Sequence, residues 1–90
     1  MKPQWTKYDN LRFNQAFWLK VPYKDDSHTL RLVVWKDSGK WRYGAINWVD
    51  WGAVKSRAEA QRRAVSTCIK LCVNAVKVLN QLRPQDAGTQ

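Results

Sequence analysis

Residues 55–82 read KSRAEAQRRAVSTCIKLCVNAVKVLNQL, and this stretch predicts one long helix that decides the fold. Ser56 and Glu59 have the S-x-x-E spacing of a capping box, in which each side chain satisfies a backbone N–H group at a helix start. Pro84 cannot continue a helix, so we expect the helix to end near Arg83. Both ends of the predicted helix are therefore marked in the sequence.

Apolar residues recur along this helix at steps of three and four, as they do on one side of an α-helix. At about 100° per residue the apolar side covers roughly 180° of the circumference, more than the roughly 100° that packing on one sheet face requires. A helix of about 26 residues is about 39 Å long, whereas strands of about eight residues span about 27 Å. We therefore expect the last turns to overhang the sheet and to need a second cover. The central apolar seam consists of Val65, Cys68, Cys72, Ala75, Leu79 and Leu82, and the overhanging residues are Val76, Leu79 and Leu82.

Three stretches ahead of the helix alternate apolar and polar residues with the period of a β-strand. They span residues 11–21, 28–35 and 40–48, and Gly44 in the third stretch predicts a bulge or a close backbone approach. Strands joined by short turns and followed by one helix predict an α+β fold: a three- or four-stranded antiparallel sheet with one long C-terminal helix packed on one face. We expect Phe17, Leu19, Leu30, Leu32 and Val34 to face the helix, and Ala16, Trp18, Lys20, Arg31, Val33 and Trp35 to face away from it.

Residues 36–40, KDSGK, predict a tight hairpin connection between the second and third of these strands. A three-residue loop on a type I turn, with Gly39 in the left-handed conformation, puts Trp35 opposite Trp41. A two-residue loop puts Trp35 opposite Arg42 instead. The sequence leaves both registers open.

The chain is strongly basic, with a formal net charge of +9 and a sequence pI near 10.0. Such a balance favours an acidic partner, of which nucleic acid is the commonest. Most of the excess positive charge lies in residues 52–83, whereas every Trp, Tyr and Phe lies in residues 5–51. The chain therefore has an aromatic half and a basic helical half.

Ninety residues are enough for one domain with a modest core and too few for two. We expect this domain to span residues 1–83, with an N-terminal arm anchored by Trp5 and Tyr8. The polar residues 84–90 are expected to form a disordered tail.

Cys68 and Cys72 are the only cysteines and lie on the apolar side of the helix. We interpret them as small core residues, because no second Cys or His pair completes a metal site and two positions four apart on a helix suit a disulfide poorly. The N-terminus after Met1 has no apolar leader, and no apolar run approaches the roughly 18 to 20 residues that cross a bilayer. The sequence therefore predicts a soluble, cytoplasmic protein with no membrane partner.

The titratable residues form no catalytic pattern. His28 is the only histidine, Asp25 and Asp26 are adjacent in a polar turn, and Glu59 is assigned to the helix cap. A Gly-rich phosphate loop, a cluster of metal ligands and an activated nucleophile are all missing from the sequence. We therefore expect a protein that is not an enzyme and that uses no cofactor or metal.

Six Trp residues are more than one small, single-faced core accommodates, so we expect two or three at a contact surface. Aromatic side chains interleaved with Arg and Lys on a sheet suit base stacking and phosphate neutralisation, and they suit a protein interface nearly as well. The predicted contact residues are Trp18, Lys20, Arg31, Trp35, Trp41 and Arg42 on the sheet, and Lys55, Arg57, Arg62, Arg63 and Lys70 on the helix and its approach.

The run DSGKWRY at residues 37–43, then Gly52, then S-x-x-E-A-x-x-x-A at residues 56–64, resembles two kinds of small DNA-binding domain. These are the three-stranded-sheet-plus-helix domains of the plant ethylene-response type and of the phage-integrase arm-binding type. The resemblance covers roughly residues 28–70 and implies a sheet that lies in the DNA major groove and contacts it with Arg and Trp side chains. The extra N-terminal strand and the longer helix depart from that pattern. The order of elements is also similar to the β-β-β-α portion of double-stranded RNA-binding domains.

The sequence thus predicts a small basic nucleic-acid-binding protein that uses an open Trp/Arg sheet face and a basic helix start. DNA is favoured over RNA, and a homodimer through Val76, Leu79 and Leu82 is the expected assembly. The alternative hypothesis is a non-enzymatic protein-interaction module, such as a phage-type inhibitor that docks on an acidic surface of a host protein complex.

Overall fold

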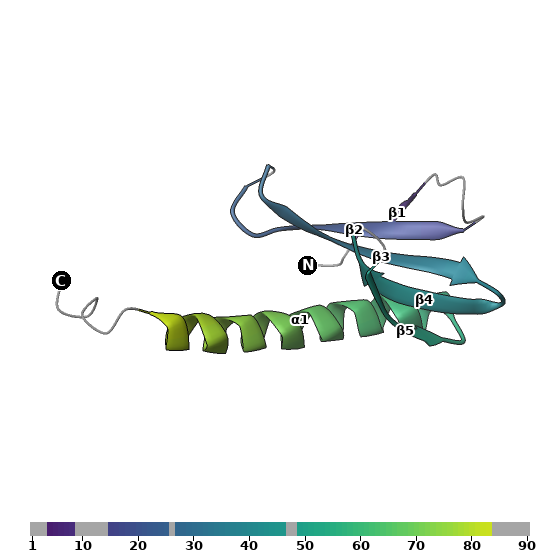
Figure 1. Cartoon of the computed structure of the whole chain (residues 1–90). Coiled ribbons are helices and arrows are strands. Elements are labelled where there is room, and N and C mark those ends of the chain that lie inside the picture. Colours follow the sequence, from purple (N-terminus) through teal and green to yellow (C-terminus); the bar gives the residue numbers. More distant parts are fainter. Residues whose placement is uncertain (1–3, 9–14, 26, 47–48, 84–90) are drawn as a thin grey trace.

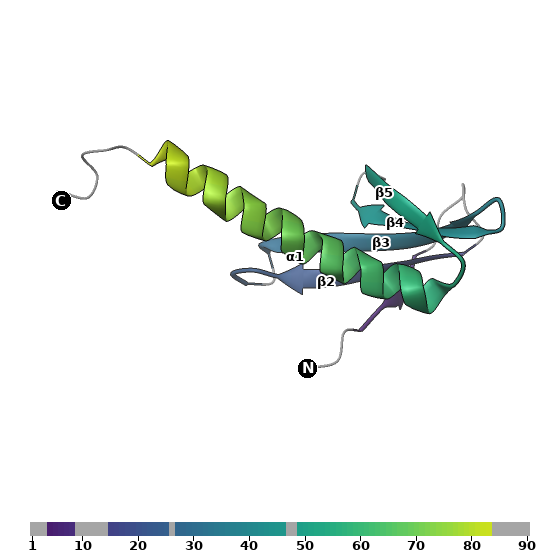
Figure 2. The same cartoon turned by 90° about the horizontal axis from the view of Figure 1, so that it is seen from below.

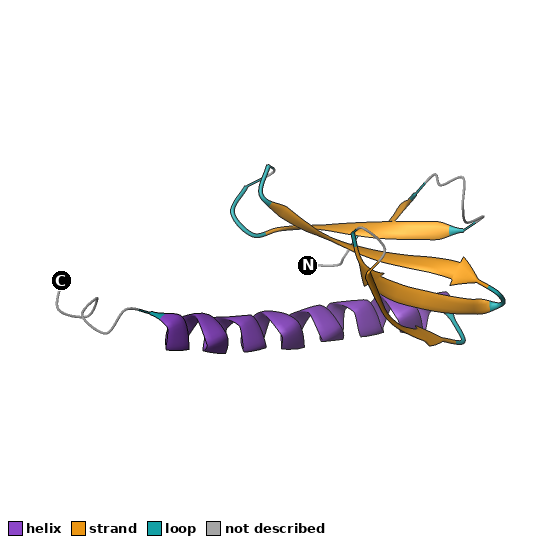
Figure 3. Ribbon diagram, viewed as in Figure 1, coloured by secondary structure: helices purple, strands orange, loops and turns teal. Residues whose placement is uncertain are grey.

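The computed structural model of the protein describes residues 4–8, 15–25, 27–46 and 49–83. In these residues five strands precede one helix, and every strand pairs antiparallel with its neighbours in sequence. The predicted α+β class is confirmed, with five strands in place of three or four. The elements are β1 (Thr6–Lys7), β2 (Ala16–Pro22), β3 (Thr29–Asp37), β4 (Lys40–Ala45), β5 (Val49–Val54) and α1 (Arg57–Leu82), as shown in Figure 1 and Figure 3.

The predicted strands correspond to β2, β3 and β4, and the two additional strands are β1 and β5. The third predicted strand is shorter than expected, because β4 ends at Ala45 and the chain returns as β5 from Val49. The predictions for residues 11–14, for residues 47–48 and for the tail at residues 84–90 lie outside the described residues.

α1 lies across one face of the sheet, and Figure 2 shows its first turns over the strands. The only fully buried residues within the described helix are Ala60 and Ala64. Their small side chains let the helix approach the strands closely, because little bulk separates the two backbones. The main core on this side joins these two alanines to Leu19, Leu32, Val34, Trp41 and Tyr43.

A second, smaller cluster lies on the opposite face of the sheet. It contains Ala16, Val33 and Trp35, with Tyr8 and Trp18 packed against it. Tyr8 follows β1 directly, and its backbone N–H donates to the carbonyl of Ala16 at 2.7 Å. The N-terminal arm therefore covers part of the face that the helix leaves free. The predicted alternation of β2 and β3 between the two faces is confirmed.

The β3–β4 hairpin has a two-residue loop, because Asp37 pairs with Lys40. Both loop residues have positive φ, 54° at Ser38 and 80° at Gly39, which is the pattern of a type I′ turn. The left-handed Gly39 is confirmed, and of the two registers that the sequence left open, the two-residue loop is the one formed. The backbone twist of a type I′ turn matches the twist of the strands, so Trp35 lies opposite Arg42.

Gly44 sits at the predicted irregularity. The β4–β5 register shifts between Tyr43 and Gly44, which leaves Trp51 as an extra residue on β5. A Cβ atom on Gly44 would overlap the carbonyl oxygen of Val49, so the two backbones come together at a distance that only glycine allows. The bulge prediction is therefore confirmed, and its extra residue lies on β5.

The helix start uses half of the predicted capping box. The Ser56 hydroxyl accepts a hydrogen bond from the backbone N–H of Glu59 at 3.2 Å. The Glu59 carboxylate faces Arg63 at 3.5 Å, one turn along the helix. At the other end, α1 stops at Leu82 with Arg83 as its cap, as Pro84 predicts.

The C-terminal half of α1 diverges from the sheet and its last turns extend beyond it (Figure 1), which confirms the predicted overhang. We call residues 69–82 the overhang. Its large apolar side chains are all exposed, from 46% at Leu71 to 71% at Leu82. These side chains are Ile69, Leu71, Val73, Val76, Val78, Leu79 and Leu82.

We predict that Gly44→Ala destabilises the protein by roughly 3 kcal/mol, because the added methyl group must push two strands apart. Gly39→Ala is the matched control. A Cβ there meets no atom within 4 Å, so only the positive φ opposes it, at roughly 1 kcal/mol. Urea denaturation of both variants measures the two costs. Equal losses of stability would contradict the close approach at the bulge.

Candidate nucleic-acid interface

Two arginines bind three of the described carboxylates. The Arg42 guanidinium contacts Asp50 (Nη1 to Oδ2, 2.8 Å) and Asp37 (Nε to Oδ2, 3.5 Å). Arg63 contacts Glu59 within the helix (Nη2 to Oε2, 3.5 Å). Arg42 alone engages two carboxylates. Fewer carboxylates are therefore available to the other cations.

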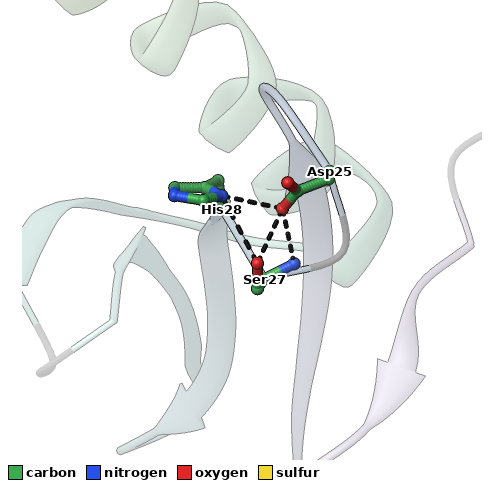
Figure 4. A network of polar contacts seen from close by, with 3 residues as sticks. All are labelled: Asp25, Ser27 and His28. Atoms are coloured by element: carbon green, nitrogen blue, oxygen red, sulfur yellow. Dashed lines mark hydrogen bonds and ion pairs between the residues drawn. The ribbon is translucent and has the colours of Figure 1, made fainter.

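The fourth described carboxylate, Asp25, closes the β2–β3 turn (Figure 4). Its Oδ1 atom accepts hydrogen bonds from the backbone N–H and the hydroxyl of Ser27, at 2.9 and 2.7 Å. The same oxygen lies 2.7 Å from Nδ1 of His28. A carboxylate that binds the backbone N–H two residues ahead is an Asx turn.

Asp25, Ser27 and His28 share the residue types of a hydrolytic triad, but their geometry differs from one. In a triad the imidazole lies between the hydroxyl and the carboxylate, so that it can take the hydroxyl proton. Here the Ser27 hydroxyl donates to Asp25, and its Oγ lies 3.4 Å from His28 Nδ1. All three residues are exposed, and they hold the turn closed.

Most of the described cations have no described carboxylate as a partner. Within the described residues, no carboxylate lies within ion-pair distance of any Lys or Arg other than Arg42 and Arg63. The start of α1 holds several of these cations close together, and the guanidinium of Arg57 lies 4.5 Å from the ring centroid of Phe17. The cations without a described anionic partner are Lys7, Lys20, Lys24, Arg31, Lys36, Lys40, Lys55, Arg57, Arg62, Lys70, Lys77 and Arg83.

A groove of about 740 Å³ runs between the segment before β1 and the first turns of α1. Trp5 forms one wall and is half-buried, since it also packs against the main core. Arg62 and Lys70 bring positive charge to the other wall. We call this cavity the Trp5 groove. Its lining residues are Trp5, Ala58, Gln61, Arg62, Val65, Ser66, Ile69 and Lys70.

A second group of predicted contact residues gathers on the sheet face away from α1. Lys20 on β2 pairs directly with Arg31 on β3. The Arg31 guanidinium lies 4.9 Å from the ring centroid of Trp18, which is a cation–π contact. We call these three residues the Trp18 patch. The sequence correctly placed all three on one face.

The structure corrects the other aromatic predictions. Trp41 is only 8% exposed and belongs to the main core, while Trp35 is 3% exposed and belongs to the second cluster. Neither ring is exposed enough to form part of a contact surface. Trp41 was misplaced because the alternation of β4 puts it on the helix side, where Phe17 lies 6.3 Å from it between ring centroids.

The predicted contact surface is therefore divided between two faces. The Trp18 patch lies on one side of the sheet, whereas Arg57, Arg62 and Lys70 lie on the helix side. Trp5 was not among the predicted contact residues, because the residues around it carry no period. The only sequence signal for it was its residue type.

The two cysteines are free, with their Sγ atoms 4.0 Å apart. Cys68 is half-buried and packs against the core, whereas Cys72 is exposed, so the prediction that both are core residues is wrong for Cys72. Burial, and then the neighbouring Cys72, raise the pKa of the Cys68 thiol. Among the described residues no three His, Cys, Asp or Glu side chains gather as metal ligands. No helix in the described part of the chain is long and apolar enough to cross a membrane.

Comparison of the chain with protein-family models, with curated proteins and with solved structures finds no match.

The β2–β3 turn makes a prediction about pH. The hydrogen bonds from His28, and then from Ser27, hold the pKa of Asp25 below its ordinary value of 3.8. A carboxyl whose pKa is lower in the folded state stabilises the fold above its ordinary pKa, and this contribution is lost as pH falls through the lowered value. NMR titration of the Asp25 carboxyl carbon should show the midpoint rising toward 3.8 in His28→Ala, and less in Ser27→Ala.

Ser66→Ala, which lies outside this turn, is the control and should leave the titration of Asp25 unchanged. An unchanged midpoint in both turn variants would show that the two hydrogen bonds are not formed in solution.

Proposed function

We propose that this protein binds nucleic acid and that the Trp5 groove receives a single-stranded segment. The main support for the proposal is the distribution of ion pairs. The described carboxylates either form ion pairs with Arg42 and Arg63 or accept hydrogen bonds within the β2–β3 turn. The cations that border the groove keep no described anionic partner. Cations that are not neutralised within the protein attract a polyanion strongly, because each phosphate they bind releases a counterion.

The lining of the groove suits a single strand. Arg62 and Lys70 are eight residues apart, which is about 12 Å along a helix axis, so each can neutralise a different phosphate of one backbone. Trp5 offers an aromatic surface on which an unpaired base can stack. Gln61 and Ser66 add groups that form hydrogen bonds without adding charge. A duplex keeps its bases stacked on one another and cannot use Trp5 in this way.

Fluorescence anisotropy with a labelled single-stranded DNA tests the proposal. We expect the affinity to fall steeply as salt rises, and Arg62→Ala or Lys70→Ala to weaken binding roughly five-fold each. Each of these variants should also reduce the slope of log affinity against log salt by about 0.7, the value for one phosphate of a single strand. Trp5→Ala should weaken binding by roughly 5- to 100-fold through lost stacking, while Trp5→Phe should lose less.

Lys24→Ala is the matched control, since it removes the same charge from the β2–β3 turn, outside the groove. If Lys24→Ala weakened binding as much as Lys70→Ala, the groove would not be the binding site. Tighter binding to a duplex of equal length would also contradict the single-strand proposal. RNA of the same sequence in the same assay tests the predicted preference for DNA.

A second candidate function is supported by the Trp18 patch. A Trp stacked with an Arg is a common centre of protein interfaces, and Lys20 adds a charge that suits an acidic protein surface. In this case the protein is an interaction module and not a nucleic-acid binder.

Capture of a partner by the immobilised protein, followed by nuclease treatment, distinguishes the two functions. The interaction module predicts that the partner stays bound after nuclease, is lost with Trp18→Ala and is kept with Arg62→Ala. Release by nuclease, or dependence on Arg62 and not on Trp18, would exclude it.

A further inference from the structure

The overhang presents a continuous row of exposed apolar side chains. About 21 Å of helix, some 10 to 12 Å across, has a lateral surface of about 700 Å², and more than half of it is apolar here, about 400 Å². The largest apolar patch on a typical monomer is about 300 to 600 Å² and often marks an interface. The overhang alone therefore reaches the size of a functional patch.

The overhang continues into an apolar cleft. The end of the β2–β3 hairpin and the middle of α1 diverge from one another (Figure 1), and two grooves of about 500 and 660 Å³ lie between them. The two grooves have four lining residues in common, two from β3 and two from α1. We call the two grooves together the hairpin cleft. The shared lining residues are Leu30, Leu32, Cys68 and Cys72.

We infer that the occupant of this cleft is the helix end of a second copy of the chain, in an antiparallel two-fold dimer. The seam residues Cys72, Ala75, Leu79 and Leu82 follow the alternating three- and four-residue steps with which two helices pack. Antiparallel pairing places Leu82 of the second copy on Cys72, and Leu79 of the second copy on Ala75. Each helix end then enters the other copy's cleft, and the two contacts are identical, as a two-fold axis requires.

The fold selects this orientation. The seam continues the side of α1 that faces the sheet, as Ala60 and Ala64 show by their burial. In a parallel, in-register pair, both sheets would have to occupy the same space between the N-terminal ends of the two helices. Antiparallel pairing moves the second sheet to the far end of the overhang. The facing side chains are also complementary in size, because the small Ala75 of one copy packs against Leu79 of the other.

Charge within the overhang permits a second copy along the seam. The cations within the overhang are Lys70 and Lys77, which lie about 160° to 180° around the helix from the seam, at about 100° per residue. Two basic helices can therefore meet along the seam while their lysines point outward. A contact area of about 800 Å² per partner is usual for a stable interface. The apolar overhang supplies at most about half of this, and the walls of the hairpin cleft add to it.

Sedimentation equilibrium at micromolar protein should give twice the chain mass of 10.6 kDa. Leu79→Glu should raise the dimer dissociation constant by roughly 100-fold or more, because it buries a charge without a partner. The substitution should leave the fold of the monomer intact, as circular dichroism can check, since Leu79 is 63% exposed. Gln81→Glu adds the same charge on the polar side and should leave the dimer intact. A wild-type monomer, or a dimer that survives Leu79→Glu, would overturn the inference.

A cross-link tests the orientation. In a Cys68→Ser background with an added oxidant, Leu82→Cys should form an intermolecular disulfide with Cys72, and the added substitution Cys72→Ser should abolish it. Cross-linking that persists without Cys72 would indicate a parallel pair joined through position 82, and would overturn the antiparallel arrangement. These measurements use no nucleic acid, so they stand or fall independently of the proposed function.

Discussion

The structure depends on one close contact, where Ala60 and Ala64 bring the first turns of α1 onto the sheet. Both residues are fully buried, and no other residue of the described helix is. A helix that carried leucines at these two positions would lie further from the strands and would leave space around Trp41 and Tyr43. Because the alanines hold only the first turns, the remaining helix contributes little to the core. The basic helix start, the Trp5 groove and the overhang all take their positions from this attachment.

The elements of the fold could be predicted because their signals are local. The Ser56 cap, the stop before Pro84 and the alternation of β2 and β3 depend on residues a few positions apart. The overhang followed from lengths alone, since about 39 Å of helix cannot be covered by strands of about 27 Å. The hairpin register was open because Ser38 had to adopt a positive φ, which is uncommon for a residue other than glycine.

The contact surface was harder to predict because it depends on which face each side chain takes after the turns are made. Trp18, Lys20 and Arg31 share one strand pair, so their alternation placed them together. Trp41 lies beyond the hairpin, where its face follows from the pairing of β4 with the rest of the sheet. Trp5 belongs to a segment without a period, and its meeting with the helix is a long-range contact that no local pattern encodes.

The bulge between β4 and β5 has a consequence for how the sheet meets other chains. β5 is an edge strand, and an edge strand with a regular row of unpaired N–H and C=O groups invites pairing with the edge of another molecule. The extra residue at Trp51 interrupts that row. The opposite edge is β1, which has only two residues. The border at β5 is therefore irregular and the border at β1 is short, and both features oppose strand addition.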